Sequence, residues 1–253
     1  MKYIDAHTHP FKEYYDNPLE IIKSWHKQDV EKMILVGTDY LNVVEVSQLI
    51  KKEDYLYGAI GIHPNDAKGK EDGEFLKKYI SNKIVAIGEV GLDYHYDDSP
   101  SKEIQKESFL AQIEVAKENN LVVMLHIREA LEDAFEIITR PEYKDVTFVF
   151  HSYSGDYEFT KKCLAYENIN FSFSGVITFK NAKSLQATLP LISLNRITCE
   201  TDTPYLTPTP FRGTPNISPY VKYVYEYIAN YLNIDLEEFV NQVRKNIERI
   251  YKI

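Results

Sequence analysis

Short runs of β-branched and aromatic residues alternate with longer segments of helical periodicity, and this alternation constrains the fold more than any other feature of the sequence. The runs cover residues 2–9, 32–38, 55–63, 83–93, 121–127, 146–152, 169–175 and 196–202. Such alternation is typical of βα units, in which helices cover a sheet of parallel strands. Eight parallel strands can close into a barrel, whereas open doubly wound sheets usually have fewer strands and often a glycine-rich phosphate loop. Neither GxGxxG nor GxxxxGK[ST] occurs in the chain, so we predict an α/β fold, a (β/α)8 barrel of the TIM type.

The segments between the runs have the spacing of amphipathic helices. Residues 101–120 are an example, and the apolar residues expected on the packed face are Ile104, Phe109, Ile113 and Ala116. We therefore expect this segment to be a helix that packs on the sheet.

No feature of the sequence divides the chain into separate domains. Glycine- or serine-rich linkers, low-complexity stretches and blocks of like charge are all absent. We therefore predict that residues 1–253 form a single domain. A proline-rich loop, residues 203–219, follows the last run, and two helical stretches come after it, at about 217–231 and 235–250. We expect these extra C-terminal helices to complete the outer ring.

Charge and cysteine content limit the partners and the location of the protein. Its formal net charge is −9, from 38 acidic residues against 29 Lys and Arg, which argues against binding nucleic acid through a broadly basic surface. An anionic substrate would need a local positive centre. Cys163 and Cys199 form neither a CxxC motif nor a disulfide framework, which indicates a reducing compartment and predicts a cytoplasmic location. The absence of a signal peptide and of a long apolar run predicts no membrane association.

Histidines and carboxylates occur where the predicted strands end. His7 and His9 lie two residues apart in the first run, and alternate side chains of a strand project to one side. The other groups that end predicted strands are His63, Glu89, His126, His151 and Asp202. In barrels of this type the catalytic groups lie at the carboxyl ends of the strands. These side chains are therefore candidates for one site.

The composition of this set favours two metal ions. A single catalytic zinc typically takes three protein ligands. Four of these histidines, without His63, and the two carboxylates suit two ions that share a bridging carboxylate. A buried ion pair is the alternative for each carboxylate, but cationic partners are scarce on these strands, Arg128 being the main exception. The mixed nitrogen and oxygen donors leave the metal open among Zn²⁺, Mn²⁺, Fe²⁺, Ni²⁺ and Mg²⁺.

The ordered set of motifs resembles the TatD family of metal-dependent hydrolases, within the amidohydrolase superfamily. The motifs are "DAHTH", "GIHP", "GEVGLDY", "FLAQIEVAKENNLVVMLHIREA", "FHSYSG", "ETDTPYL" and "RGTPN", and they span nearly the whole chain. The resemblance implies a distorted (β/α)8 barrel with metal-dependent deoxyribonuclease or other phosphodiesterase activity. It also implies a first metal held by His7, His9, Glu89 and Asp202. The second metal would be held by Glu89, His126 and His151, with Glu89 as the bridge.

Further roles follow from position and chemistry. We expect Glu89 and Asp202 to be catalytic, Asp202 as acceptor of the proton of the attacking water. His63 and Arg128 are candidates for binding phosphate. The planar guanidinium group of Arg matches the geometry of that anion. Glu200 and Asp5 are expected to face inward, where they either orient ligand imidazoles or serve a structural role.

Aromatic residues in the loops after the strands are candidates for contact with nucleic-acid bases. They are Tyr94, Tyr153 and Tyr205. The partner that these features predict is DNA or another phosphodiester, with no obligatory protein partner.

Two alternatives remain open. The same metals could hydrolyse an amide or another ester, including an aminoacyl ester of transfer RNA, because such enzymes use the same activated water. The second alternative is a non-catalytic barrel that binds metal structurally, with closed coordination and no position for water.

Overall fold

A computed structural model describes residues 1–253, and the chain divides into two compact units. Unit 1 consists of residues 1–35 and 151–253, and unit 2 consists of residues 36–150. The prediction of a single domain stays a prediction. None of the helices is long and apolar enough to cross a bilayer.

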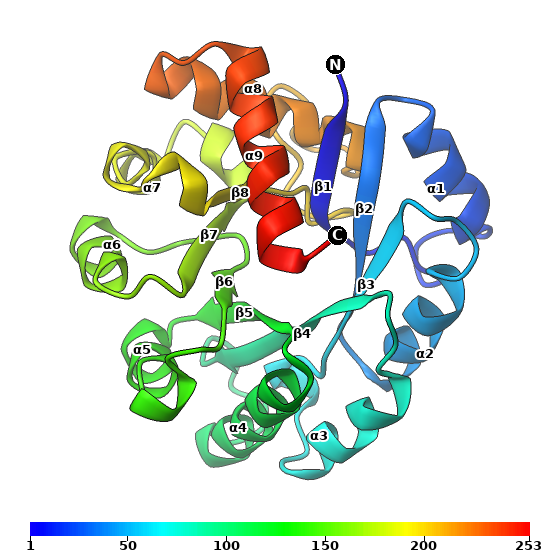
Figure 1. Ribbon diagram of the computed structural model, residues 1–253, viewed down its shortest axis with the longest axis vertical. Coiled ribbons are helices and arrows are strands. Elements are labelled where there is room, and N and C mark those ends of the chain that lie inside the picture. Colours follow the sequence, from blue (N-terminus) through cyan, green and yellow to red (C-terminus); the bar gives the residue numbers. More distant parts are fainter. The chain divides into compact units, whose positions relative to one another are not determined.

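Each of the eight predicted runs overlaps a β-strand, and the strands follow one another in one sheet in the order β1 to β8 (Figure 1). The strands are β1 (Tyr3–Thr8), β2 (Val30–Gly37), β3 (Leu56–Ile60), β4 (Ile84–Asp93), β5 (Val122–Arg128), β6 (Phe148–Phe150), β7 (Ile169–Phe173) and β8 (Ile197–Cys199). The neighbouring strands β1 and β2, β3 and β4, β4 and β5, β5 and β6, and β7 and β8 pair in parallel. A parallel sheet with strands in sequential order is the arrangement that repeated βα units produce.

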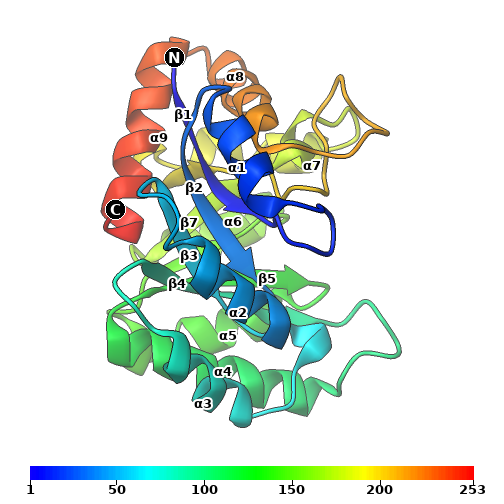
Figure 2. The same cartoon turned by 90° about the vertical axis from the view of Figure 1, so that its right-hand side faces the viewer.

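The helices of unit 1 cover its strands. They are α1 (Pro18–His26), α6 (Tyr157–Leu164), α7 (Lys183–Gln186), α8 (Val221–Leu232) and α9 (Leu236–Tyr251). Helix α9 packs against β1 and β8 and lies alongside β1 in both views (Figures 1 and 2). Its buried stripe includes Phe239, Val243 and Ile247, at intervals of four residues. The two predicted C-terminal helices are therefore present, with α8 beginning later than expected, after a 3₁₀ turn at Ser218–Tyr220.

The helices of unit 2 are α2 (Tyr40–Leu49), α3 (Glu71–Leu76), α4 (Lys102–Asn119) and α5 (Leu131–Ile138). Helix α4 confirms the helix predicted at residues 101–120: the Ser101 side chain caps its first turn, and Asn120 ends it in the left-handed conformation. Phe109, Ile113 and Ala116 are fully buried, but Ile104 is 39% exposed. Five residues of helix separate Ile104 from Phe109, which places the two side chains about 140° apart around the axis.

Strands β3 and β8 each end three residues earlier than the sequence predicts, and β6 ends at Phe150, one residue before His151. Strand β3 stops at Ile60, and His63 instead caps a 3₁₀ turn over Pro64–Asp66. Strand β8 stops at Cys199, so that Glu200 and Asp202 lie in the following loop. Asp202 has a φ of +61°, a left-handed conformation that a strand does not contain. The loops, rather than the strands, therefore direct these three side chains.

Candidate metal centre

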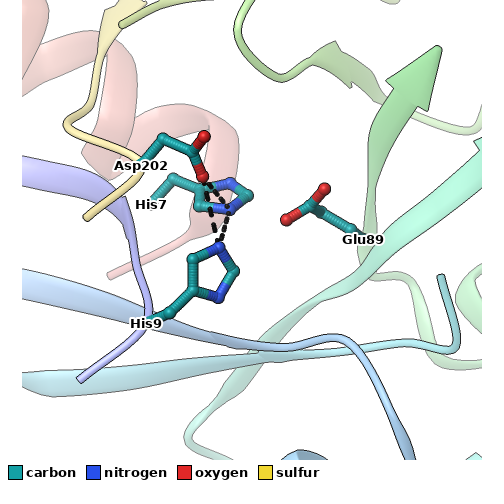
Figure 3. A group of neighbouring side chains, drawn as sticks. All are labelled: His7, His9, Glu89 and Asp202. Carbon is teal, nitrogen blue, oxygen red and sulfur yellow. Dashed lines mark hydrogen bonds and ion pairs between the residues drawn. The ribbon is translucent and has the colours of Figure 1, made fainter. Parts of the chain in front are cut away.

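Three side chains of unit 1 converge on one point. The Nε2 atoms of His7 and His9 are 3.0 Å apart, as expected for alternate residues of an extended segment. Oδ1 of Asp202 lies 3.2 Å from Nε2 of His9 and 3.5 Å from Nε2 of His7. Figure 3 shows the three side chains pointing toward one another, and it also draws Glu89, which belongs to unit 2. All three are at least nine-tenths buried.

The loop after β8 brings Asp202 to β1 from 193 positions away in the chain. The backbone N–H of Asp202 donates to the carbonyl of His7 at 3.0 Å, and the N–H of Tyr205 donates to the carbonyl of Asp202 at 2.8 Å. Aspartate tolerates the left-handed conformation better than most residues. The backbone therefore holds this carboxylate in place independently of what its oxygens bind.

A second histidine–carboxylate pair completes the polar cluster of unit 1. Oε1 of Glu200 lies 2.7 Å from Nδ1 of His151, and the His151 ring stacks on His7 with centroids 3.9 Å apart. Glu200 also accepts hydrogen bonds from the backbone N–H of Ser152 at 2.7 Å and from the hydroxyl of Ser172 at 2.5 Å. Burial by itself raises the pKa of Glu200, but the rings of His151 and His7 and the Ser172 hydroxyl lower it below its usual value. Glu200 therefore lies against Nδ1 of His151, and Nε2 is the ring nitrogen that does not face this carboxylate.

Asp5 binds the loop that follows β8. Its carboxylate accepts hydrogen bonds from the backbone N–H of Thr201 at 2.9 Å, from the hydroxyl of Thr201 at 2.6 Å and from the hydroxyl of Ser218 at 2.5 Å. Complete burial raises the pKa of Asp5 to about 7, against the lowering effect of these donors. These hydrogen bonds fasten the loop after β8 to β1, and an orienting role of Asp5 toward a ligand imidazole stays a prediction.

Four side chains of unit 2 form a second cluster around His126. Nδ1 of His126 lies 3.1 Å from Oε2 of Glu89, and its Nε2 lies 3.1 Å from Oδ2 of Asp93. The ring of His63 meets that of His126 edge to face, with centroids 4.1 Å apart. Ligand atoms of His63, Asp93 and His126 all lie within 4.8 Å of one another. The sequence predictions did not include Asp93, although it lies four positions after Glu89, a spacing that places two residues on one face of a regular strand.

A glycine allows β4 to approach β5 closely beside this cluster. Gly91 pairs with His126, has a φ of +148°, and a Cβ at this position would lie 2.2 Å from the carbonyl oxygen of His126. Any other residue would push the two strands apart or force a strained backbone. The glycine in "EVGLD" therefore sets the separation of the strands that carry Glu89 and His126.

Arg128 engages an aromatic ring of the next loop. Its Nη1 donates to the hydroxyl of Tyr96 at 3.0 Å, and the guanidinium lies 5.1 Å from the centre of the Tyr96 ring. Tyr96 itself is 48% exposed. The role of Arg128 in gripping phosphate stays a prediction.

The three tyrosines expected to contact bases differ in their surroundings. Tyr205 is 50% exposed and its hydroxyl bonds that of Tyr14. Tyr94 donates to Asp133 at 2.8 Å. Tyr153 is only 2% exposed and bonds the hydroxyl of Thr160 at 2.8 Å. The prediction for Tyr153 is wrong, because its ring packs against Phe171 in the interior of unit 1.

Comparison with known families identifies the chain. The family described as TatD-related DNase matches residues 4–252. The chain belongs to this family. It is 40% identical over 253 residues to the uncharacterized metal-dependent hydrolase YabD of Bacillus subtilis, with 98% of each chain covered. It is 30% identical over 260 residues to the uncharacterized metal-dependent hydrolase YcfH of Escherichia coli K12, covering 100% of this chain and 97% of the relative.

Solved structures support the same assignment of the fold. The crystal structure of YjjV, a TatD homologue from Escherichia coli K12, matches with a TM-score of 0.90 at 24% identity, covering 99% of this chain and 98% of that one. A hydrolase of the TatD family from Entamoeba histolytica matches with a TM-score of 0.84 at 20% identity, covering 99% and 98%. The predicted (β/α)8 fold of the TIM type and the resemblance to the TatD family are confirmed. The chain is a metal-dependent hydrolase by family, with His, Glu and Asp groups that could hold a metal.

Proposed function

We propose that the protein is a metal-dependent phosphodiesterase that cleaves DNA, and that it holds two divalent cations. His7, His9, Glu89 and Asp202 hold the first cation, and Glu89, His126 and His151 hold the second, with Glu89 shared. We further propose that it works in the cytoplasm, where its two buried thiols, Cys163 and Cys199, stay reduced.

The convergence of His7, His9 and Asp202 is the observation that carries this proposal. Their three donor atoms lie within 3.5 Å of one another in a buried location. One proton between the two Nε2 atoms satisfies a single hydrogen bond, whereas a cation accepts a lone pair from all three atoms. The donor set, two imidazoles with carboxylate oxygen, suits a divalent transition metal.

The histidines proposed for the second cation each have one ring nitrogen next to a buried carboxylate. Nδ1 of His151 faces Glu200, so Nε2 would bind the cation. Nε2 of His126 faces Asp93, so Nδ1, on the side of Glu89, would bind it. Metal-binding histidines characteristically donate the proton of the second nitrogen to such a group.

Divalent cations at this position supply Lewis acidity toward a phosphate oxygen and lower the pKa of water. In our proposal Asp202 accepts the proton of the attacking water, since its backbone is fixed and its side chain is 10% exposed. His63 and Arg128 hold the scissile phosphate. A local positive centre of this kind also reconciles an anionic substrate with the net charge of −9.

An activity screen on metal-loaded protein tests the proposal. Purified protein is stripped with a chelator, reloaded with Zn²⁺, Mn²⁺, Fe²⁺, Ni²⁺ or Mg²⁺, and assayed on a 3′-labelled oligodeoxynucleotide and on a panel of carboxylic esters, aminoacyl-tRNA and cyclic amides. We expect about two bound equivalents of a transition metal and cleavage of the oligonucleotide. Cleavage of only the esters or amides would overturn the assigned substrate. Failure to bind any metal would overturn the site itself.

A further inference from the structure

Asp93 is a buried carboxylate that the proposed chemistry does not use. Its side chain is 1% exposed, and Oδ2 faces Nε2 of His126 at 3.1 Å, while His126 itself is 21% exposed. The other ring nitrogen of His126 faces Glu89 at the same distance. The ring is therefore held between two carboxylates, and a neutral imidazole has only one proton to share between them.

The backbone of Asp93 is fixed by helix α4. The side chain of Gln105 accepts from the N–H of Asp93 at 2.9 Å and donates to its carbonyl at 2.9 Å. The backbone N–H of His95 donates to Oδ1 of Asp93 at 3.0 Å, which leaves Oδ2 for His126. Gln105 is 2% exposed, so water does not compete for these bonds.

The same helix makes a matching pair of bonds next to His63. Gln112, seven residues after Gln105 and on the same face of α4, accepts from the N–H of Ile62 at 2.8 Å and donates to its carbonyl at 3.0 Å. His63 follows directly and contacts the His126 ring edge to face. Two buried glutamines on one helix thus fix the backbone at Asp93 and next to His63.

From this geometry we propose that Asp93 is a positioning residue, which holds the proton of His126 on Nε2 and so leaves the lone pair of Nδ1 directed toward Glu89. The inference rests on the proposed function in one respect, that Nδ1 is the nitrogen that binds the second cation. A neutral acceptor at this position would let the proton move to Nδ1, where it would block binding. Glu200 faces Nδ1 of His151, whereas Asp93 faces Nε2 of His126. The two pairs therefore leave different ring nitrogens for the cation, Nε2 in His151 and Nδ1 in His126.

The ring tautomer of His126 in metal-free protein tests the inference without any activity assay. ¹⁵N NMR of ring-labelled histidine is recorded over a series of pH values, the tautomer is read where the His126 ring carries a single proton, and His126 is assigned by its loss in His126→Gln. We expect the Nε2–H tautomer in the wild-type chain and a shift toward Nδ1–H in Asp93→Asn. Asp133→Asn, on α5 of the same unit, is the matched control and leaves the tautomer unchanged. An Nδ1–H tautomer in the wild-type protein overturns the inference without need of any variant.

Metal titration supplies the second readout. Asp93→Asn is expected to weaken one of two bound equivalents by about 10–100-fold, the usual effect of removing such a partner, and to leave the other unchanged. Asp93→Glu, which keeps the carboxylate, should recover part of the affinity. Equal metal affinities in wild type and Asp93→Asn overturn the inference. Loss of a third bound metal equivalent in Asp93→Asn also overturns it, because Asp93 would then be a metal ligand together with His63. A wild-type protein that binds no metal refutes the proposed function, while the tautomer still decides the role of Asp93.

Discussion

His151 in unit 1 and His126 in unit 2 both lie against a buried carboxylate, but they use opposite ring nitrogens. Glu200 approaches Nδ1 of His151 at 2.7 Å, and Asp93 approaches Nε2 of His126 at 3.1 Å. The His151 side chain is 6% exposed and stacks on His7, whereas His126 is 21% exposed. In our proposal each carboxylate holds one proton on the ring nitrogen that it faces, so the side from which the carboxylate approaches decides which nitrogen carries the proton.

The two carboxylates are also held by different means. Glu200 lies in a loop and accepts from Ser152 and Ser172, so its position depends on side chain and backbone donors of other segments. Asp93 ends β4, and its backbone is clamped by Gln105. We therefore expect the pair in unit 1 to contribute more to stability, because its histidine is more deeply buried, and the pair in unit 2 to act mainly on the metal.

Removal of the shared ligand should have the largest effect, because it affects both proposed cations. Glu89→Ala is expected to lower hydrolysis by more than about 100-fold and to reduce the bound metal to at most one equivalent. Metal analysis and steady-state kinetics measure both quantities. Glu142→Gln, an exposed carboxylate of unit 2, is the control. Unchanged hydrolysis in Glu89→Ala would exclude Glu89 as the bridge.

Glu200→Gln should destabilise the protein more than Asp93→Asn does. Loss of the charge paired with His151 leaves a buried polar group poorly compensated and is expected to cost roughly 3 kcal/mol of unfolding free energy, against about 1–2 kcal/mol for Asp93→Asn. Urea denaturation of the metal-free proteins compares the two. Equal losses of unfolding free energy would show that the two pairs contribute equally to stability despite the deeper burial of His151.

Metal binding should stabilise the folded protein measurably. At a free metal concentration of about 100 times Kd, binding to the folded state alone adds about 2.7 kcal/mol to the unfolding free energy for each site. Glu200→Gln and Asp93→Asn should each lose part of this gain. A melting temperature that does not depend on metal concentration would contradict binding to the native state.

Gln105→Ala tests whether helix α4 fixes the pair in unit 2. The substitution leaves the backbone N–H and carbonyl of Asp93 without their partner, so we expect a loss of roughly 1–2 kcal/mol and a weaker second metal site. Gln112→Ala removes the equivalent bonds to Ile62 and should cost a similar free energy, with less effect on the metal. Denaturation and metal titration of the two variants show whether Gln105 acts specifically on the second metal site or only stabilises the fold, as we expect of Gln112.

The smallest effect is expected from the exposed hydroxyl pair of unit 1. Tyr205→Phe removes the bond to Tyr14 at an exposed position and should change the unfolding free energy by less than about 1 kcal/mol. If Tyr205 contacts bases through its ring, Tyr205→Ala should raise KM for the oligonucleotide while Tyr205→Phe leaves it unchanged. An equal KM in all three proteins would contradict base contact by Tyr205.

Much of the fold was predictable because its signals are local. The runs of β-branched and aromatic residues all overlap strands, and the pattern at residues 101–120 marks helix α4 to within one residue at each end. The strand ends were harder to predict. His63 and Glu200 lie beyond the ends of β3 and β8. A proline-initiated turn follows His63 and a left-handed aspartate follows Glu200, and both depend on backbone conformation that periodicity does not reveal.

The candidate site likewise contains residues that local geometry made predictable and residues that it did not. His7 and His9 were predicted to share one side, since strand geometry alone requires it, and their Nε2 atoms meet. Asp93 was missed because the predictions considered only the histidine or carboxylate already noted on each strand. Tyr153 was misassigned because a loop position does not reveal burial, which its packing against Phe171 decides.

The sequence alone determined the parallel βα architecture and the pairing of His7 with His9, because periods of two and of about 3.6 residues act over short distances. Tertiary structure decided which carboxylate meets which histidine. Asp202 reaches His9 across 193 positions, and Glu200 and Asp93 select opposite nitrogens of their rings. Such choices depend on where loops turn and which helix buries which backbone, and these are properties of the packed chain.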